Sequence, residues 1–108
     1  LAAVISIYTV QEVVVFCRDR LAAPEPAQVA ALALRELLRH AVRVVPLLSR
    51  IERIRYARAF PTRDASDLPH LIVAHLHHCD AIIAYDEHFR ETTKLLPYLQ
   101  PQELLALI

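Results

Sequence analysis

Short apolar segments alternate with longer amphipathic segments along the chain. The apolar runs over residues 1–6, 42–45 and 81–85 are short and rich in β-branched residues, which predicts buried strands, and 95–99 predicts an edge strand. Apolar residues at helical spacing predict helices over 9–21, 27–40, 50–60, 67–78 and 102–107, with one or two further turns after Asp86. Strands separated by helices favour an α/β fold with a mostly parallel central sheet flanked by helices on both faces.

Polar residues indicate where these helices begin. Thr9 is expected to cap the first helix, and Ser49 the helix over 50–60. Ser66 or Asp67 is expected to cap the helix that ends near residue 78. Pro69 would then lie in the first turn, where its missing N–H has no helical partner to lose. The length of 108 residues predicts a single domain over residues 1–108.

The composition narrows the function classes. With 108 residues and 56% hydrophobic residues, the chain is long and apolar enough to fold. Twelve basic residues balance twelve acidic ones, which argues against a globally basic nucleic-acid binder and an acidic tail. The balance hides a split, because residues 18–63 hold ten Arg against four acids, and residues 64–108 hold two bases against seven acids. This split fits a metal-dependent enzyme acting on a phosphodiester, although two ordinary solvated faces would give the same sums.

The start of the chain and its cysteines indicate the cellular compartment in which the protein works. The chain contains no Met and opens inside an apolar run, so we expect an excerpt of a longer polypeptide. No positive charge precedes that run, which argues against a signal peptide, and no apolar stretch approaches the roughly 18 residues of a membrane span. Cys17 and Cys79 are too few for a disulfide scaffold. We therefore expect a cytoplasmic protein with reduced thiols and no membrane partner.

Three carboxylates lie near the predicted carboxyl ends of strands, where ligands of open parallel sheets bind. Asp86 ends the strand 81–85, Glu12 lies early in the helix after the first strand, and Asp67 begins a helix. Oxygen ligands of this kind suit Mg²⁺ or Mn²⁺. Asp64 could add a further carboxylate beside Asp67. The alternative roles are ordinary ones, since Asp67 and Asp86 could be helix caps and Glu12 a solvated residue. We expect at least one of the three to have a raised pKa, and we choose Asp86 as the most desolvated.

Two further patterns have competing interpretations. His75 and Cys79 are four residues apart and could share a zinc ion, but they fall on the expected core side of their helix, so we interpret the histidines of this segment as packing or surface residues. The arginines after residue 49 form no clean stripe and are either RNA contacts or solvated side chains. This series comprises Arg50, Arg53, Arg55, Arg58 and Arg63.

Three segments in this order resemble the PIN domain, the nuclease fold of VapC-like toxins and related ribonucleases. They are ISIYTVQEV (5–13), DASDLPHLIVA (64–74) and CDAIIAYDEHF (79–89), with Phe89 as a packing residue, and PQELL (101–105) fits the family's closing helix. The resemblance implies a three-layer domain whose catalytic metal ligands include Glu12, Asp67 and Asp86, with Mg²⁺ or Mn²⁺ as cofactor. It also implies cleavage of single-stranded RNA, a homodimer, and inhibition by an antitoxin protein.

The chain departs from the family pattern in two places. The family's first strand, which is central in the sheet and ends in an Asp, is expected upstream of Leu1, so the domain is incomplete at its N-terminus. The family's Thr two residues before the last Asp is Ala84 here. These departures leave a second hypothesis open, a catalytically impaired PIN-like module that binds protein or RNA. A third hypothesis, a mostly helical protein-binding domain, requires the strand predictions to fail.

Overall fold

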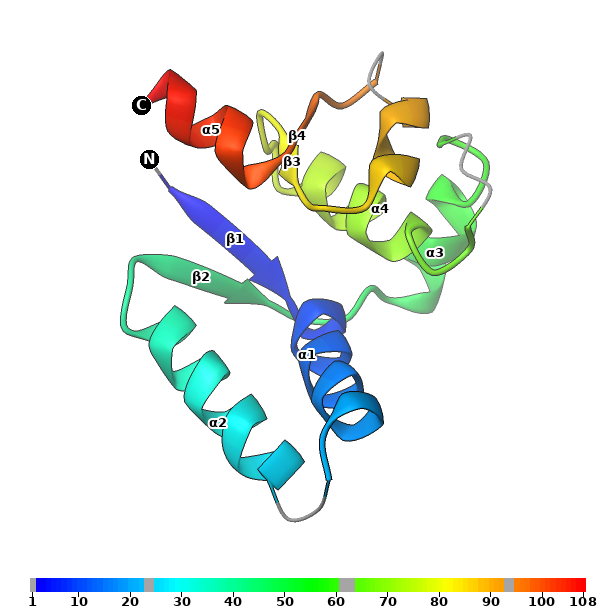
Figure 1. Cartoon of the computed structure of the whole chain (residues 1–108). Coiled ribbons are helices and arrows are strands. Elements are labelled where there is room, and N and C mark those ends of the chain that lie inside the picture. Colours follow the sequence, from blue (N-terminus) through cyan, green and yellow to red (C-terminus); the bar gives the residue numbers. More distant parts are fainter. Residues whose placement is uncertain (1, 23–24, 61–63, 93–94) are drawn as a thin grey trace. The chain divides into compact units, whose positions relative to one another are not determined.

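The computed structural model describes residues 2–22, 25–60, 64–92 and 95–108 (Figure 1). The chain forms two compact units, Leu1–Leu47 and Leu48–Ile108. Within the described residues, these units contain five α-helices and four short strands, all paired in parallel. The predicted α/β class with parallel strands is therefore confirmed. The expectations for Leu1, for the start of the loop after Phe60 and for Arg63 fall outside the described residues.

The first unit is built from two strands connected by two helices. Strand β1 (Ala3–Ser6) leads into α1 (Ile7–Arg20), and α2 (Glu25–Leu38) is followed by β2 (Val42–Val45). The two strands pair in register from Ala3 opposite Val42 to Ser6 opposite Val45. A parallel pair needs a long crossover, and the packed helices α1 and α2 supply it (Figure 1).

The first helix begins earlier than predicted, and Ser6 caps it in place of Thr9. Ser6 has an extended backbone, with φ −99° and ψ 166°, and its Oγ accepts a hydrogen bond from the Thr9 backbone N–H. Thr9 therefore lies at the third position of the helix and supplies a donor that needs a cap. The physical reason is that Ser6 ends the strand, so the chain turns into the helix at once.

The second unit carries the remaining elements. Helix α3 (Arg50–Tyr56) and helix α4 (Leu68–Leu76) precede strand β3 (Ile82–Ile83), and the 3₁₀ helix η1 (Glu87–Thr92) precedes strand β4 (Tyr98–Leu99) and helix α5 (Pro101–Leu107). Its core is centred on α4, where Leu71, Ile72, Val73 and Ala74 are all buried. Four consecutive buried residues mean that the middle of α4 is covered on all sides, which explains the apolar run from Leu71 to Ala74.

The cap of α3 follows the sequence prediction, although the helix is shorter than predicted. Ser49 Oγ accepts from the Glu52 backbone N–H at 3.1 Å, and the Glu52 carboxylate accepts from the Ser49 backbone N–H at 2.8 Å. This reciprocal pair is a capping box. The helix ends at Tyr56 because the chain turns there, closed by a bond from the Ala59 N–H to the Tyr56 carbonyl, and the turn leads to the buried Phe60.

The described strands form two separate two-stranded sheets, β1 with β2 and β3 with β4. In the second sheet, Ile82 lies opposite Tyr98, and Ile83 opposite Leu99. Backbone bonds from Ile82 N–H to the Pro97 carbonyl and from Ala84 N–H to the Leu99 carbonyl fix this register. The strand expected over 81–85 thus pairs over two residues only, and the segment that ends at Asp86 leaves the sheet directly before η1.

Candidate metal centre

Asp67 is a buried acidic residue in the second unit. It directly precedes α4, and only 6% of its surface is exposed. Its backbone is already helical, with φ −80° and ψ −25°, and within the described residues its side chain makes no capping hydrogen bond. Asp67 therefore occupies the predicted N-cap position, but its side chain does not act as the expected cap. Among the described residues, its buried Oδ2 has no hydrogen-bond partner, so the carboxylate is not explained by the needs of the helix.

Asp64 is held beside Asp67 by a tight turn. The Asp67 backbone N–H donates to the Asp64 carbonyl at 3.1 Å, which closes the turn. Asp64 Oδ1 accepts from the Ser66 backbone N–H at 2.9 Å and from the Ser66 hydroxyl at 2.6 Å. These two hydrogen bonds lower the pKa of Asp64, the hydroxyl more than the amide. Asp64 is therefore held as a carboxylate at neutral pH.

Asp86 and His88 form a second pair at the start of η1. Asp86 Oδ1 accepts from the His88 backbone N–H at 2.9 Å, so Asp86 does act as a cap. The same oxygen lies 3.2 Å from His88 Nδ1, within hydrogen-bonding distance of the ring. Both side chains are accessible, with 46% of Asp86 and 61% of His88 exposed. The imidazole therefore lies beside the carboxylate two residues before it, on an accessible part of the second unit.

Phe89 holds η1 against the core of the second unit. Phe89 is buried, as predicted for a packing residue. Its ring stacks on Tyr98 with the ring centres 6.3 Å apart, and it meets His70 of α4 edge-on at 6.5 Å. Because His88 is the neighbouring residue, this packing also determines where the imidazole lies relative to the start of α4.

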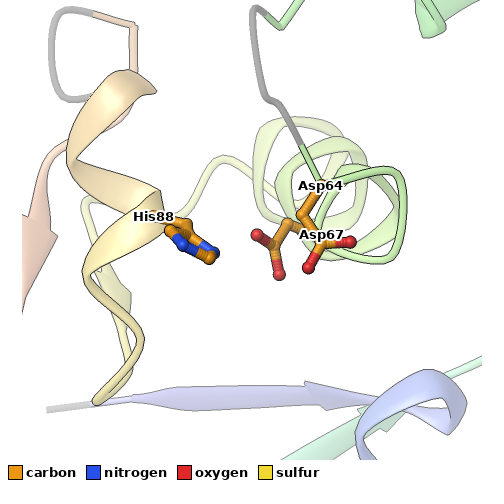
Figure 2. Close-up of side chains that lie close together, drawn as sticks. All are labelled: Asp64, Asp67 and His88. Atoms are coloured by element: carbon orange, nitrogen blue, oxygen red, sulfur yellow. The ribbon is translucent and has the colours of Figure 1, made fainter.

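Asp64, Asp67 and His88 converge as a result. One potential ligand atom from each lies within 4.8 Å of the other two. Figure 2 shows His88 extending from η1 toward the two carboxylates, which lie side by side at the start of α4. Within the described part of the chain, this is the one group of three or more metal-binding side chains. Two carboxylate oxygens and one imidazole nitrogen are a donor set that suits a divalent cation.

The raised pKa of Asp67 is consistent with its burial beside other carboxylates. Burial raises the pKa of Asp67, and the nearby Asp64 and Asp86 raise it further, while His88 and His70 act in the opposite direction. The sequence led us to expect Asp86 to be the most desolvated carboxyl, which is wrong because Asp86 is exposed at the start of η1. A bound cation would offset the unfavourable field at Asp67, since it favours the charged form.

The sequence-predicted residues are therefore only partly brought together. Asp67 and Asp86 lie in the same local region of the second unit, close enough for Asp86 to act electrostatically on Asp67. Glu12 is exposed on α1 in the first unit, and its membership of the site stays a prediction. Asp64, expected only as an additional carboxylate, is part of the cluster.

Sequence reasoning missed His88. The available signal was the Asp-x-His spacing directly after a strand. In this spacing the Asp86 carboxylate accepts a hydrogen bond from the His88 backbone N–H, and the His88 ring then lies close to the same carboxylate. Attention to His75 and Cys79 was misplaced, since the His75 ring contacts the aromatic rings of Tyr56 at 5.4 Å and Phe60 at 5.8 Å. His75 thus contacts α3 and the turn after it, but the residue is exposed, so its expected position on the core side is wrong and it is a surface histidine.

Comparisons with known proteins add no relative. No protein-family model, curated protein sequence or solved structure matches this chain. Along the described residues, none of the helices is long and apolar enough to cross a membrane. The geometry around Asp67 and the motifs in the sequence are therefore the observations that bear on the function of the chain.

Proposed function

We propose that the chain is a PIN-type ribonuclease domain that uses Mg²⁺ or Mn²⁺ to cleave single-stranded RNA, and that it resembles a VapC-like toxin. The observation that carries the proposal is the buried carboxylate of Asp67, whose Oδ2 has no partner among the described residues. A buried carboxylate next to other carboxylates is unfavourable for folding, so its presence is better explained by a cation that it binds.

The strand pairing supports the finer, three-layer form of this proposal. Within the described residues, β1 pairs with β2 and β3 pairs with β4, and both pairs are parallel. The proposed domain has one mostly parallel sheet covered by helices on both faces.

The residues have separate roles in the proposed reaction. Asp67 and Asp86 hold the metal from the second unit, and Glu12 is the third carboxylate ligand that the resemblance implies. When bound, the metal would polarise a phosphate oxygen and lower the pKa of a coordinated water. The protein's own contribution is to hold charged carboxylates close together at the end of β3 and the start of α4, at a position that solvent reaches through the exposed Asp86 and His88.

The arginines of the second unit support RNA as the substrate. Arg50, Arg53, Arg55 and Arg58 are all exposed on α3 and the turn that follows it. Guanidinium groups bind phosphate through two parallel hydrogen bonds, and several of them give salt-dependent affinity for a nucleic acid. A homodimer, an inhibitory antitoxin and a cytoplasmic location belong to the same proposal.

A catalytically impaired module that binds RNA or protein is the second candidate. Ala84 favours it, because this residue follows β3, two positions before Asp86, and has no hydroxyl with which to organise the site. In such a module the carboxylates would hold a metal or remain charged without supporting hydrolysis. Binding of RNA without cleavage would distinguish this candidate from the nuclease.

Cleavage of a labelled single-stranded RNA tests the proposal. The protein is incubated with RNA and Mn²⁺ or Mg²⁺, and a parallel sample contains a chelator. We expect cleavage that requires the metal and is lost in Asp67→Asn, while the exposed Asp80→Asn serves as a matched control and retains activity. Cleavage that persists in the chelator or in Asp67→Asn would contradict the proposal, and so would intact RNA under all conditions.

A further inference from the structure

The imidazole of His88 gives the metal centre a nitrogen ligand, which the three predicted carboxylates do not supply. We propose that His88 and Asp64 bind the same metal ion as Asp67, and that the nitrogen ligand makes this site select Mn²⁺ over Mg²⁺. The inference deepens the proposed function, on whose metal site it rests. It adds two residues to the site and decides between the two cofactors.

The spacing of the three side chains allows a single ion. Three ligand atoms spaced evenly around one first-row metal at about 2.1 Å lie no more than about 3.6 Å apart. The observed ligand atoms lie within 4.8 Å of one another, so closure requires a movement of no more than about 1.2 Å. His88 can make this movement because its side chain is 61% exposed and is therefore not confined by packing.

Asp86 orients the imidazole for this role. Asp86 Oδ1 lies 3.2 Å from His88 Nδ1, and a histidine that donates its Nδ1–H to a carboxylate presents Nε2 as the ligand nitrogen. This carboxylate–histidine–metal arrangement fixes the tautomer and makes the imidazole a better ligand. Asp86 is thus a positioning residue for His88, in addition to its proposed contact with the metal.

The buried Asp67 provides independent support for a ligand at this position. Its Oδ2 is inaccessible and, within the described residues, lacks any hydrogen-bond partner. Asp64 and Asp67 together would bring two negative charges, which balance a divalent cation. The geometry therefore supplies both the charge and an unsatisfied buried acceptor at the same place.

The chemistry of the ligands decides the choice of metal. Mg²⁺ prefers oxygen ligands and retains several waters, so an imidazole nitrogen adds little to its binding. Mn²⁺ accepts oxygen ligands equally well and also binds imidazole in mixed sites. A site of two carboxylates and one imidazole therefore gains affinity for Mn²⁺ from the nitrogen, and it gains little for Mg²⁺.

The test measures binding of Mn²⁺ and Mg²⁺ separately from catalysis. Isothermal titration calorimetry gives the two affinities for the wild type, for His88→Gln and for His40→Gln. His40 is a matched control because it is an exposed histidine near the carboxylate of Glu36, at 3.8 Å, in the first unit. Pulsed electron paramagnetic resonance of bound Mn²⁺ detects a coordinated nitrogen directly, and circular dichroism checks that each variant is folded.

We expect His88→Gln to lose Mn²⁺ affinity by about 10-fold or more, the size usual for changes to the groups around a metal. Its Mg²⁺ affinity should change by less than about 3-fold, and the nitrogen signal of bound Mn²⁺ should disappear, whereas His40→Gln should match the wild type. Equal losses for both metals, a nitrogen signal that survives in His88→Gln, or no metal binding by the wild type would overturn the inference.

The two proposals can fail separately. Mn²⁺ binding through His88 without RNA cleavage would uphold the metal site and contradict the nuclease. Cleavage supported equally by Mg²⁺ and Mn²⁺, and unchanged in His88→Gln, would uphold the nuclease and contradict the role of His88.

Discussion

Replacing Asp67 with Asn should stabilise the metal-free protein at neutral pH. A buried polar group left without a partner costs about 1–3 kcal/mol, and Asp67 carries a buried, unpartnered Oδ2 among the described residues. Asparagine has nearly the same shape, removes the charge, and offers an amide that can donate to the neighbouring Asp64 or Asp86. We therefore expect a gain of about 1–2 kcal/mol in the free energy of unfolding.

The sign of the pH dependence follows from the raised pKa of Asp67. A carboxyl whose pKa is raised in the folded state above its ordinary value of 3.8 holds its proton more tightly when the protein is folded. The wild type therefore loses stability as the pH rises from 3.8 through the folded-state pKa, and below 3.8 Asp67 is neutral in both states. The advantage of Asp67→Asn should be complete at neutral pH and vanish in acid.

Thermal and urea unfolding, followed by circular dichroism in a chelator, measure this effect. A gain of about 1 kcal/mol corresponds to roughly 4–8 °C in Tm for a domain of this size. Asp80→Asn, which removes an exposed aspartate of the same unit, should change stability by less than about 0.5 kcal/mol. Addition of Mn²⁺ should reverse the order, because metal bound only by the folded wild type stabilises it by about 2.7 kcal/mol at 100 times its Kd.

A loss of stability in Asp67→Asn without metal would refute the reasoning. It would mean that the carboxylate has a favourable structural partner and that its burial needs no cation. An equal response of wild type and variant to Mn²⁺ would refute the metal-binding role of Asp67 specifically.

Three further changes probe the surrounding structure. Phe89→Ala should lower the free energy of unfolding by about 3–5 kcal/mol, measured by urea unfolding, and should weaken Mn²⁺ binding because η1 loses its contacts to Tyr98 and His70. Ser6→Ala should cost about 1 kcal/mol in thermal unfolding, since it removes the cap of α1, whereas Thr9→Ala should cost less; equal losses would contradict the assigned cap. Ala84→Thr should raise the rate of metal-dependent RNA cleavage by restoring the hydroxyl of the PIN pattern, and an unchanged rate would argue against that pattern.

Much of the local structure follows from the sequence. The strand Val42–Val45 and the Ser49 cap of α3 were predicted as observed, because β-branched residues favour a pleated backbone and a serine followed three residues later by glutamate satisfies the helix N-terminus within one turn. The parallel α/β class was also accessible, since short apolar strands alternate with helices. The strand and the cap depend on interactions between residues that are close in the chain.

The tertiary structure decided which carboxylate is buried and what lies beside it. Asp67 and Asp86 have similar positions in the sequence, because each directly precedes a helical segment. Asp67 is nevertheless buried in the second unit, whereas Asp86 is exposed to solvent. His88 reaches Asp64 and Asp67 only because Phe89 packs on Tyr98 and against α4, which brings together residues more than twenty positions apart. The sequence alone determined the candidate carboxylates and the helices that carry them. Burial and long-range packing, which no local pattern encodes, determined the charge environment of Asp67 and the nitrogen ligand that completes the cluster.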